Sequence, residues 1–224
     1  HYTYDSLKLE AAKFLIRNMP HCYSYQQGGE MDSVKRVRTY YSPFGQIDQT
    51  YARRWGHYTY RNLPKIYDAH IITAEYLIDN IDRAFDNWQK RPWNRSLSFE
   101  DFCEYLLPYR IGDEPLEEWR ELYEKKYGYL LDSIYKGSDV VEAANLVSRH
   151  LQEPVFIYCE DFELPHIGPR YLFSHRYGSC VDAADIVTYA FRAVGIPCME
   201  DTDARGGHVW NVVRDTTGRD VPIW

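Results

Sequence analysis

Residues 176–184 read Arg-Tyr-Gly-Ser-Cys-Val-Asp-Ala-Ala, and residues 206–211 read Gly-Gly-His-Val-Trp-Asn. The first segment predicts a turn of small residues leading into a helix that begins at Cys180 and ends near Gly195. The second segment places His208 inside an apolar, β-branched run that is typical of a strand. A cysteine at the start of a helix, with a histidine on a neighbouring strand, is an arrangement that activates a thiol as a nucleophile.

Short apolar runs around this helix predict a small sheet. Residues 196–199, 209–213 and 221–224 are bounded by turn residues and are expected to form three strands. Residues 154–158 form a further β-type run, and Pro165, Gly168 and Pro169 predict a loop after it.

The first 152 residues have a helical pattern instead. Apolar residues recur at helical spacing after each of the predicted helix starts, which are Asp5 or Ser6, Thr73, Ser98, Pro115, and Ser138 or Asp139. Residues 21–64 are rich in turn signals and predict loops with short helices. We therefore expect an α+β fold with a helical region over residues 1–152 and a core over residues 153–224. The pattern leaves open whether the two regions are continuous.

The composition argues against several classes of function. A net charge of −7 argues against nucleic-acid binding, and no apolar run approaches the length of a membrane span. The five cysteines have irregular spacing without a CxxC motif, so neither a disulfide framework nor a zinc ribbon is predicted. No cofactor or metal is expected, because phosphate-binding glycine loops and metal signatures are absent. The set Cys159, His166, His175 and Cys180 fits no known zinc spacing.

The chain contains 21 tyrosines and 6 tryptophans. Such residues have a large apolar body and a polar tip, so they suit either a helical core or a half-exposed cleft for peptide or sugar. The sequence alone leaves both interpretations open.

The chemistry expected at Cys180 follows from its place in the chain. The N–H groups at a helix start favour a thiolate and can also hold the oxyanion of a tetrahedral intermediate. His208 is the best candidate for the base that pairs with the sulfur. The alternative, from spacing alone, is a half-buried cysteine under a helix and a histidine at the edge of a strand.

Three segments together resemble the core of the transglutaminase-like superfamily. They are Tyr177-Gly-Ser-Cys180, Phe191-Arg-Ala-Val-Gly-Ile-Pro197 and His208-Val-Trp-Asn211, and the resemblance covers residues 170–224. It implies a cysteine helix packed on an antiparallel sheet, and a papain-like site with Cys180 as nucleophile and His208 as base. The region over residues 1–150 more weakly resembles secreted bacterial members of unknown function. A secreted, periplasmic or cell-surface location is therefore expected, although this chain contains no signal segment.

The third member expected from the resemblance is an aspartate about sixteen residues after the histidine. That position falls on Trp224 or beyond it, in a chain that ends inside a predicted strand. We therefore expect the acid beyond Trp224, or Asp220 in its place, or no acid at all. Tyr177 and His175 are the candidate oxyanion donors, and Trp210 is a candidate substrate contact.

These observations predict a cysteine hydrolase or acyltransferase acting on amide bonds of peptides or peptide-containing glycans. The alternative is a catalytically impaired binding module with an aromatic-rich cleft for peptide or glycan. Substrate choice is expected to depend on residues 21–64 and 88–98, and the oligomeric state is left open.

Overall fold

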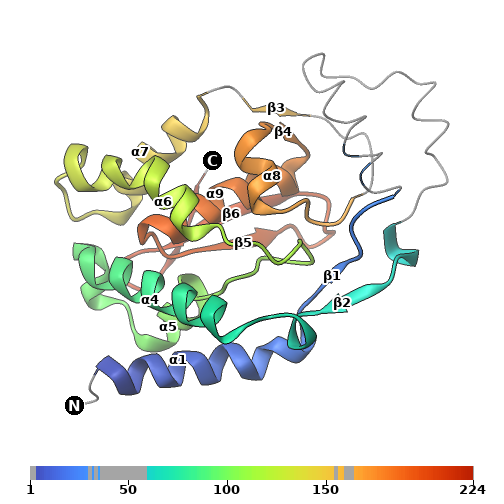
Figure 1. Cartoon of the computed structure of the whole chain (residues 1–224). Helices are drawn as coiled ribbons and strands as arrows, with labels where there is room; N and C mark the ends of the chain where they lie inside the picture. The colour runs from blue at the N-terminus through green and yellow to red at the C-terminus, as the bar shows by residue number, and fades with distance from the viewer. Residues whose placement is uncertain are drawn as a thin grey trace.

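Helix α9 (Cys180–Val194) lies at the centre of the computed structural model in Figure 1. The structure describes residues 4–29, 32, 35, 60–153, 156–158 and 164–223. The described elements place the chain in the α+β class, as the sequence predicts.

One face of α9 packs on an antiparallel sheet at the C-terminal end of the chain. The sheet has the order β5 (Cys198–Thr202), β6 (Val209–Arg214), β7 (Asp220–Ile223), which confirms the three predicted strands. In its register, Val213 lies opposite both Cys198 and Val221. Two further strand pairs are short. β1 (Tyr23–Tyr25) pairs antiparallel with β2 (Lys65–Tyr67), and β3 (Ile157–Tyr158) pairs parallel with β4 (Tyr177–Gly178).

Helices cover the remaining sides of α9, and further helices pack on these. They are α1 (Tyr4–Asn18), α4 (Ala74–Lys90), α5 (Phe99–Tyr105), α6 (Arg120–Tyr129), α7 (Val140–Leu151) and α8 (Pro169–Ser174). Short 3₁₀ turns span Met19–His21, Tyr60–Asn62, Asp68–His70 and Pro92–Ser96, and a π-helical turn spans Leu130–Ile134. Helices α4, α6, α7 and α8 all contact α9.

Three predicted helix starts are confirmed by their caps. Thr73 accepts a hydrogen bond from the Tyr76 backbone N–H at 3.2 Å, and Ser98 accepts one from Asp101 at 3.0 Å. Asp139 accepts from the second and third residues after it, at 2.7 and 3.2 Å. Each side chain satisfies N–H groups that have no partner within the helix.

Two predictions of local structure are wrong. The helix expected from Pro115 begins only at Arg120. The segment before Arg120 is bound to α4 instead, because the Glu117 carbonyl accepts a hydrogen bond from the Tyr76 hydroxyl at 3.0 Å. The loop expected around Pro169 contains helix α8, in which proline occupies the first turn, where its missing N–H is harmless. The prediction of loops over residues 21–64 falls largely outside the described residues, although β1 lies within it.

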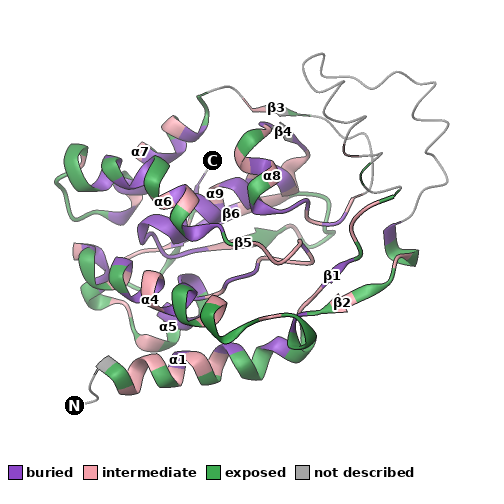
Figure 2. Ribbon diagram, viewed as in Figure 1, coloured by how far each residue is buried: buried purple, intermediate pink, exposed green. Residues whose placement is uncertain are grey.

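A single buried cluster joins the helical region to the C-terminal sheet. It includes Trp93, Trp119 and Tyr123 from the helical part together with Val213 and Ile223 from the sheet. Figure 2 shows α9 almost wholly buried at the middle of this cluster. The predicted boundary near residue 152 therefore does not divide the hydrophobic core.

A second cluster packs α1 against α4 and α5. The Trp88 ring stacks on Phe102 with centroids 4.4 Å apart, and Cys103 is buried beside them. Cys103 is thus a core residue, as its place in an apolar stripe predicts.

Two buried arginines tie the helical region to α9. Arg120 donates to the Asn80 side chain at 2.6 Å and to the carbonyl of Arg192 at 3.2 Å. Arg192 itself donates to the carbonyls of Tyr105 and Cys198 at 3.2 and 3.1 Å. Because backbone carbonyls satisfy both guanidinium groups, these side chains act as internal cross-links between elements.

Candidate active site around Cys180

A closed hydrogen-bonded turn positions Cys180 as the first residue of α9. The Asp182 carboxylate accepts from the backbone N–H of Ser179 at 2.7 Å and from its hydroxyl at 3.1 Å. A Cβ atom at Gly178 would collide with this carboxylate, so the turn requires glycine there. The small residues before the cysteine therefore have a local structural role, and the first N–H groups of the helix lie beside the thiol.

Cys180 and His208 line the same cavity, which has a volume of about 310 Å³. Its walls come mainly from α7, α9, β6 and the end of β7, and most of the surface is apolar. Among the lining residues are Leu151, Phe156, Tyr158, Val187, Trp210 and Ile223. The structure therefore places Cys180 and His208 on the walls of one cavity.

His208 directly precedes β6 and is exposed. Its backbone carbonyl accepts from the Asp203 N–H at 3.1 Å, and its ring centroid lies 6.1 Å from that of Trp210. Among the described residues no hydrogen bond joins the His208 ring to the Cys180 sulfur. The two groups share the walls of one cavity.

The strand that carries His208 is fixed to the cysteine helix through Asn211. Its side-chain amide donates to the Ala184 carbonyl at 3.1 Å and to the Thr188 hydroxyl at 2.8 Å. Asn211 is buried, so these bonds hold β6 in a defined position along α9. The sequence motif contains Asn211, but its pattern alone does not indicate this role.

The other described thiols are poor nucleophiles. Burial raises the pKa of Cys22, and it raises the pKa of both Cys103 and Cys198 to about 12. Because the thiolate is the reactive form, these three cysteines are expected to be inert near neutral pH. Cys180 is half-buried and lines a cavity, whereas Cys159 lies outside the described residues.

Asp220 does not lie beside His208, so the prediction that it orients the histidine is corrected. It pairs across the sheet with Arg214, six residues along β6 from His208, which corresponds to about 20 Å at about 3.3 Å per residue. Its carboxylate accepts from the Tyr105 hydroxyl at 3.0 Å and lies 3.2 Å from the Arg214 guanidinium. Burial and this hydrogen bond raise the pKa of Tyr105 to about 12, so its hydroxyl remains the donor. The predicted acid at or beyond Trp224 lies outside the described residues.

The three other candidate residues, Trp210, His175 and Tyr177, lie in different parts of the fold. Trp210 lines the thiol cavity. His175 is stacked on Tyr171 with centroids 4.3 Å apart, and its Nδ1 lies 3.0 Å from the Tyr171 carbonyl, so it belongs to the end of α8. The side chain of Tyr177 lies outside the described residues, and its backbone pairs with Ile157.

The structure also reveals a polar group that the sequence motifs do not predict. His166 Nδ1 lies 2.9 Å from both carboxylate oxygens of Asp185, a fully buried residue of α9. Glu200 of β5 interacts with Asp185 and accepts from the Thr188 hydroxyl at 3.1 Å. The available signal is an aspartate on the apolar side of the predicted helix, between Ala184 and Ile186, since a buried carboxylate needs a partner.

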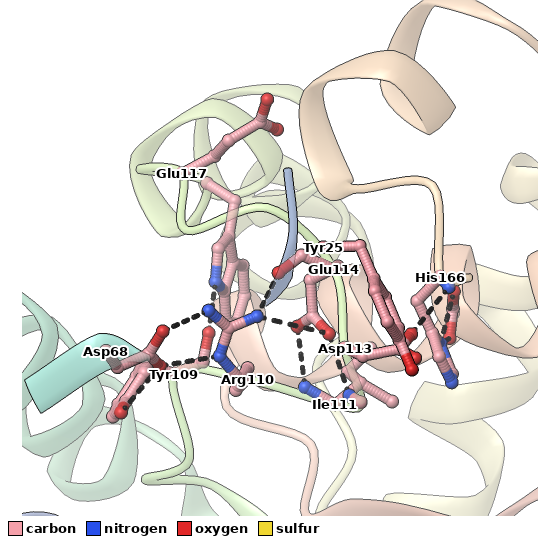
Figure 3. Close-up of polar contacts among 12 residues, drawn as sticks. Tyr25, Asp68, Tyr109, Arg110, Ile111, Asp113, Glu114, Glu117 and His166 are labelled. Atoms are coloured by element: carbon pink, nitrogen blue, oxygen red, sulfur yellow. Dashed lines mark hydrogen bonds and ion pairs between the residues drawn. The ribbon is translucent and has the colours of Figure 1, made fainter. Parts of the chain in front are cut away.

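A second buried group supports the loop next to His166 (Figure 3). The Arg110 guanidinium binds both carboxylate oxygens of Asp68, with a distance of 2.6 Å from Nε to Oδ2. Glu114 accepts from the backbone N–H groups of Ile111 and Gly112, both at 2.7 Å. These contacts hold residues 110–114 in place beneath the histidine ring.

No family model matches the chain, and no match is found among the curated proteins or the solved structures. None of the described helices is both long and apolar enough to cross a membrane. Within the described residues, no group of three or more His, Cys, Asp or Glu side chains is arranged to hold a metal ion.

Proposed function

We propose that the chain is a transglutaminase-like cysteine hydrolase or acyltransferase that acts on amide bonds of peptides or peptide-containing glycans. One observation carries this proposal: Cys180, at the first residue of a capped helix, shares a cavity with His208 at the start of the neighbouring strand. The resemblance of three segments to the superfamily core, in the same order, supports it. A secreted, periplasmic or cell-surface location belongs to the same proposal.

The reaction begins with attack of the Cys180 sulfur on the amide carbonyl carbon. His208 takes the thiol proton as the C–S bond forms, and the N–H groups of the first turn of α9 hold the oxyanion. His208 then gives the proton to the departing amine as the C–N bond breaks, which leaves a thioester on Cys180. Water, the acceptor we favour, or a second amine attacks the thioester, and the proton returns to the sulfur through His208.

A second candidate function is a binding module that retains this fold without catalysis. The position of Asp220 favours it, because that carboxylate is engaged with Tyr105 and Arg214 and leaves His208 without its help. In this alternative the aromatic wall of the cavity, with Phe156, Tyr158 and Trp210, would hold a peptide or glycan.

Alkylation of the thiols with iodoacetamide across pH, followed by peptide mapping, distinguishes the two functions. The enzyme requires selective labelling of Cys180 well below about pH 8, where an ordinary thiol is mostly protonated. His208→Ala is expected to slow this labelling by about tenfold or more, because the sulfur loses its base.

His150→Ala serves as the matched control, since His150 lies on α7 with its Nδ1 3.0 Å from the Leu146 carbonyl. It is expected to leave the labelling rate of Cys180 unchanged. Labelling of Cys180 with the pH profile of a free thiol, insensitive to His208→Ala, would exclude the catalytic proposal and favour the binding module.

A further inference from the structure

A second and larger cavity lies against the same end of α9 as Cys180. Its volume is about 730 Å³, and its lining includes Ser179, Val181 and Asp182 from the first turn of the helix. Cys180, Ala183 and Ala184 line the thiol cavity instead. The first turn of α9 therefore lies between the two cavities.

His166 lines this second cavity, and hydrogen bonds fix both its backbone and its ring. Its backbone N–H donates to the Asp113 carboxylate at 2.9 Å, and its Nδ1 is bound by Asp185. Figure 3 shows Asp113 beside the labelled His166 ring. The ring lies so close to Gly112 that any larger residue there would collide with it. The other ring nitrogen, Nε2, has no hydrogen-bond partner among the described residues.

The charge on His166 makes Nε2 a donor. Burial disfavours the imidazolium, but the charge and hydrogen bond of Asp185 outweigh burial and raise the pKa of His166 to about 10. Burial raises the pKa of Glu200 well above its ordinary value, and the charge of Asp185 raises it further. At neutral pH, Nε2 therefore carries a proton and requires an acceptor.

The carboxylates that line the cavity already accept hydrogen bonds from the protein. Asp113 accepts from the His166 backbone, and Asp182 accepts from Ser179. Two more cationic or basic side chains, Arg61 and His21, belong to the same lining. His166 Nε2 is the charged donor at this wall, and an anionic oxygen is its natural complement.

We propose that this cavity binds a carboxylate group of the substrate, with His166 Nε2 as the donor and Asp185 as the residue that positions it. This inference rests on the proposed function, since it makes the substrate of Cys180 a peptide with an acidic side chain or a free chain terminus. Asp185, which holds the His166 ring, lies five residues after Cys180 on α9, which corresponds to about 7.5 Å along the helix axis.

The test uses ¹⁵N-imidazole NMR of the full chain at neutral pH, with the His166 signals assigned by their loss in His166→Gln. Sodium acetate is expected to shift the Nε2–H signal of His166 saturably, with a Kd on the order of millimolar for one charged contact. Acetamide, the neutral isostere of acetate, is expected to leave the signal unchanged at equal concentration. Both titrations use the unmodified protein, and His166→Gln serves only to assign the signal.

Asp185→Asn removes the carboxylate that positions the ring and is expected to weaken acetate binding by about tenfold. Two further probes distinguish the two sources of the carboxylate by their relative affinity. N-acetylglycine presents a chain terminus, and the α-amide of N-acetylglutamate retains only the side-chain carboxylate. A signal that does not move with acetate, or that moves equally with acetamide, overturns the inference.

The outcome is separable from that of the proposed function. Cys180 that labels selectively while His166 ignores acetate leaves the thiol chemistry standing and overturns the carboxylate site. Acetate binding at His166 with an unreactive Cys180 overturns the proposed catalysis and keeps the carboxylate site.

Discussion

Asp185 is an acidic residue of α9 in a fully buried position. It faces the His166 ring, and it lies beside a second acid, Glu200. Burial raises the pKa of both carboxyl groups, and the charge of Asp185 raises that of Glu200 further. The chain retains this arrangement where an apolar residue would pack more simply, which is typical of residues selected for function.

The ion pair makes stability depend on pH in a defined direction. The pKa of His166 rises from about 6.5 in the unfolded chain to about 10 in the folded protein, with Asp185 as the main favourable partner and Glu114 and Glu200 adding to it. Its stabilisation is fully present below about pH 6.5 and is lost as the pH rises toward about 10. The difference in unfolding free energy between wild type and His166→Gln should therefore shrink over this range, as measured by urea titrations.

The control for this prediction is the same substitution in an Asp185→Asn background. With its partner removed, His166→Gln should no longer produce a pH-dependent difference over the same range. A difference between wild type and His166→Gln that stays constant, or grows, as the pH rises would contradict the assignment of the ion pair.

At the scale of elements, both ends of α9 are fixed by different means. Asp182 and Ser179 close the N-terminal end, whereas at the C-terminal end Gly195 adopts a left-handed conformation with φ of 84°. The Gly195 carbonyl accepts from the Trp93 indole and the Asn94 amide, both at 2.9 Å, and Arg91 donates to the Val194 carbonyl at 2.7 Å. The carbonyls that end a helix without partners are thus satisfied by the 3₁₀ turn at Pro92–Ser96 and the residue before it.

Gly195→Ala should destabilise the protein more than the same change at Gly218. Both glycines have positive φ, 84° and 81°, so alanine costs about 1 kcal/mol of backbone strain at either site. Only at Gly195 does the new Cβ also meet a backbone atom, the Asn87 carbonyl oxygen at 2.8 Å. We expect an additional loss of about 1–3 kcal/mol there from overpacking, measured by chemical denaturation.

Gly218 isolates the backbone contribution, because a Cβ atom added there would meet no described heavy atom within 4 Å. Equal losses at the two sites would show that crowding against α4 does not contribute. The comparison therefore separates conformational strain from packing at the end of the helix.

Elements with strong local signals were predictable from the sequence. The cysteine helix, its terminal glycine and the three strands after it follow from apolar spacing and turn residues, and side-chain caps mark the starts of α4, α5 and α7. The start of α6 and the existence of α8 were not predictable, because long-range bonds such as Tyr76 to Glu117 decide where those helices begin and end.

The residues of the candidate site likewise divide into those with a local sequence signal and those that depend on long-range contacts. Cys180 and His208 are recognisable from short motifs, whereas His166 and Asp185 meet only when the loop before α8 folds over α9. Asp220 was misplaced because its role depends on sheet register, which sets it opposite Arg214.

For the whole molecule, the buried arginines decide whether the helical region and the sheet unfold together. Arg120 contacts the carbonyls of Leu106, Leu107 and Pro108 on one side and of Arg192 on the other. Together with the shared hydrophobic cluster, these bonds join the two regions at several points. Unfolding is therefore expected to be cooperative across both of them.

Arg120→Met tests this expectation. It should lower the unfolding free energy by about 3 kcal/mol or more, since several buried carbonyls would each lose a donor worth about 1–3 kcal/mol. Tryptophan fluorescence and far-ultraviolet circular dichroism should still report one coincident transition. Arg149→Met, on the exposed side of α7, is the matched control and should change stability by less than about 0.5 kcal/mol. Separate transitions in the wild-type protein would show that the two regions are independent domains.

The central position of α9 has a consequence for motion. The part of α9 from Ala184 to Val194 is largely buried, so its amide hydrogens can exchange with solvent only when the elements packed around the helix come apart. These amide hydrogens should therefore be among the slowest to exchange. The helix that carries Cys180 is then a fixed support on the timescale of ligand binding. Any opening that admits a substrate must come from the surrounding segments, such as the loop from Asp203 to His208, while the sulfur stays where the core holds it.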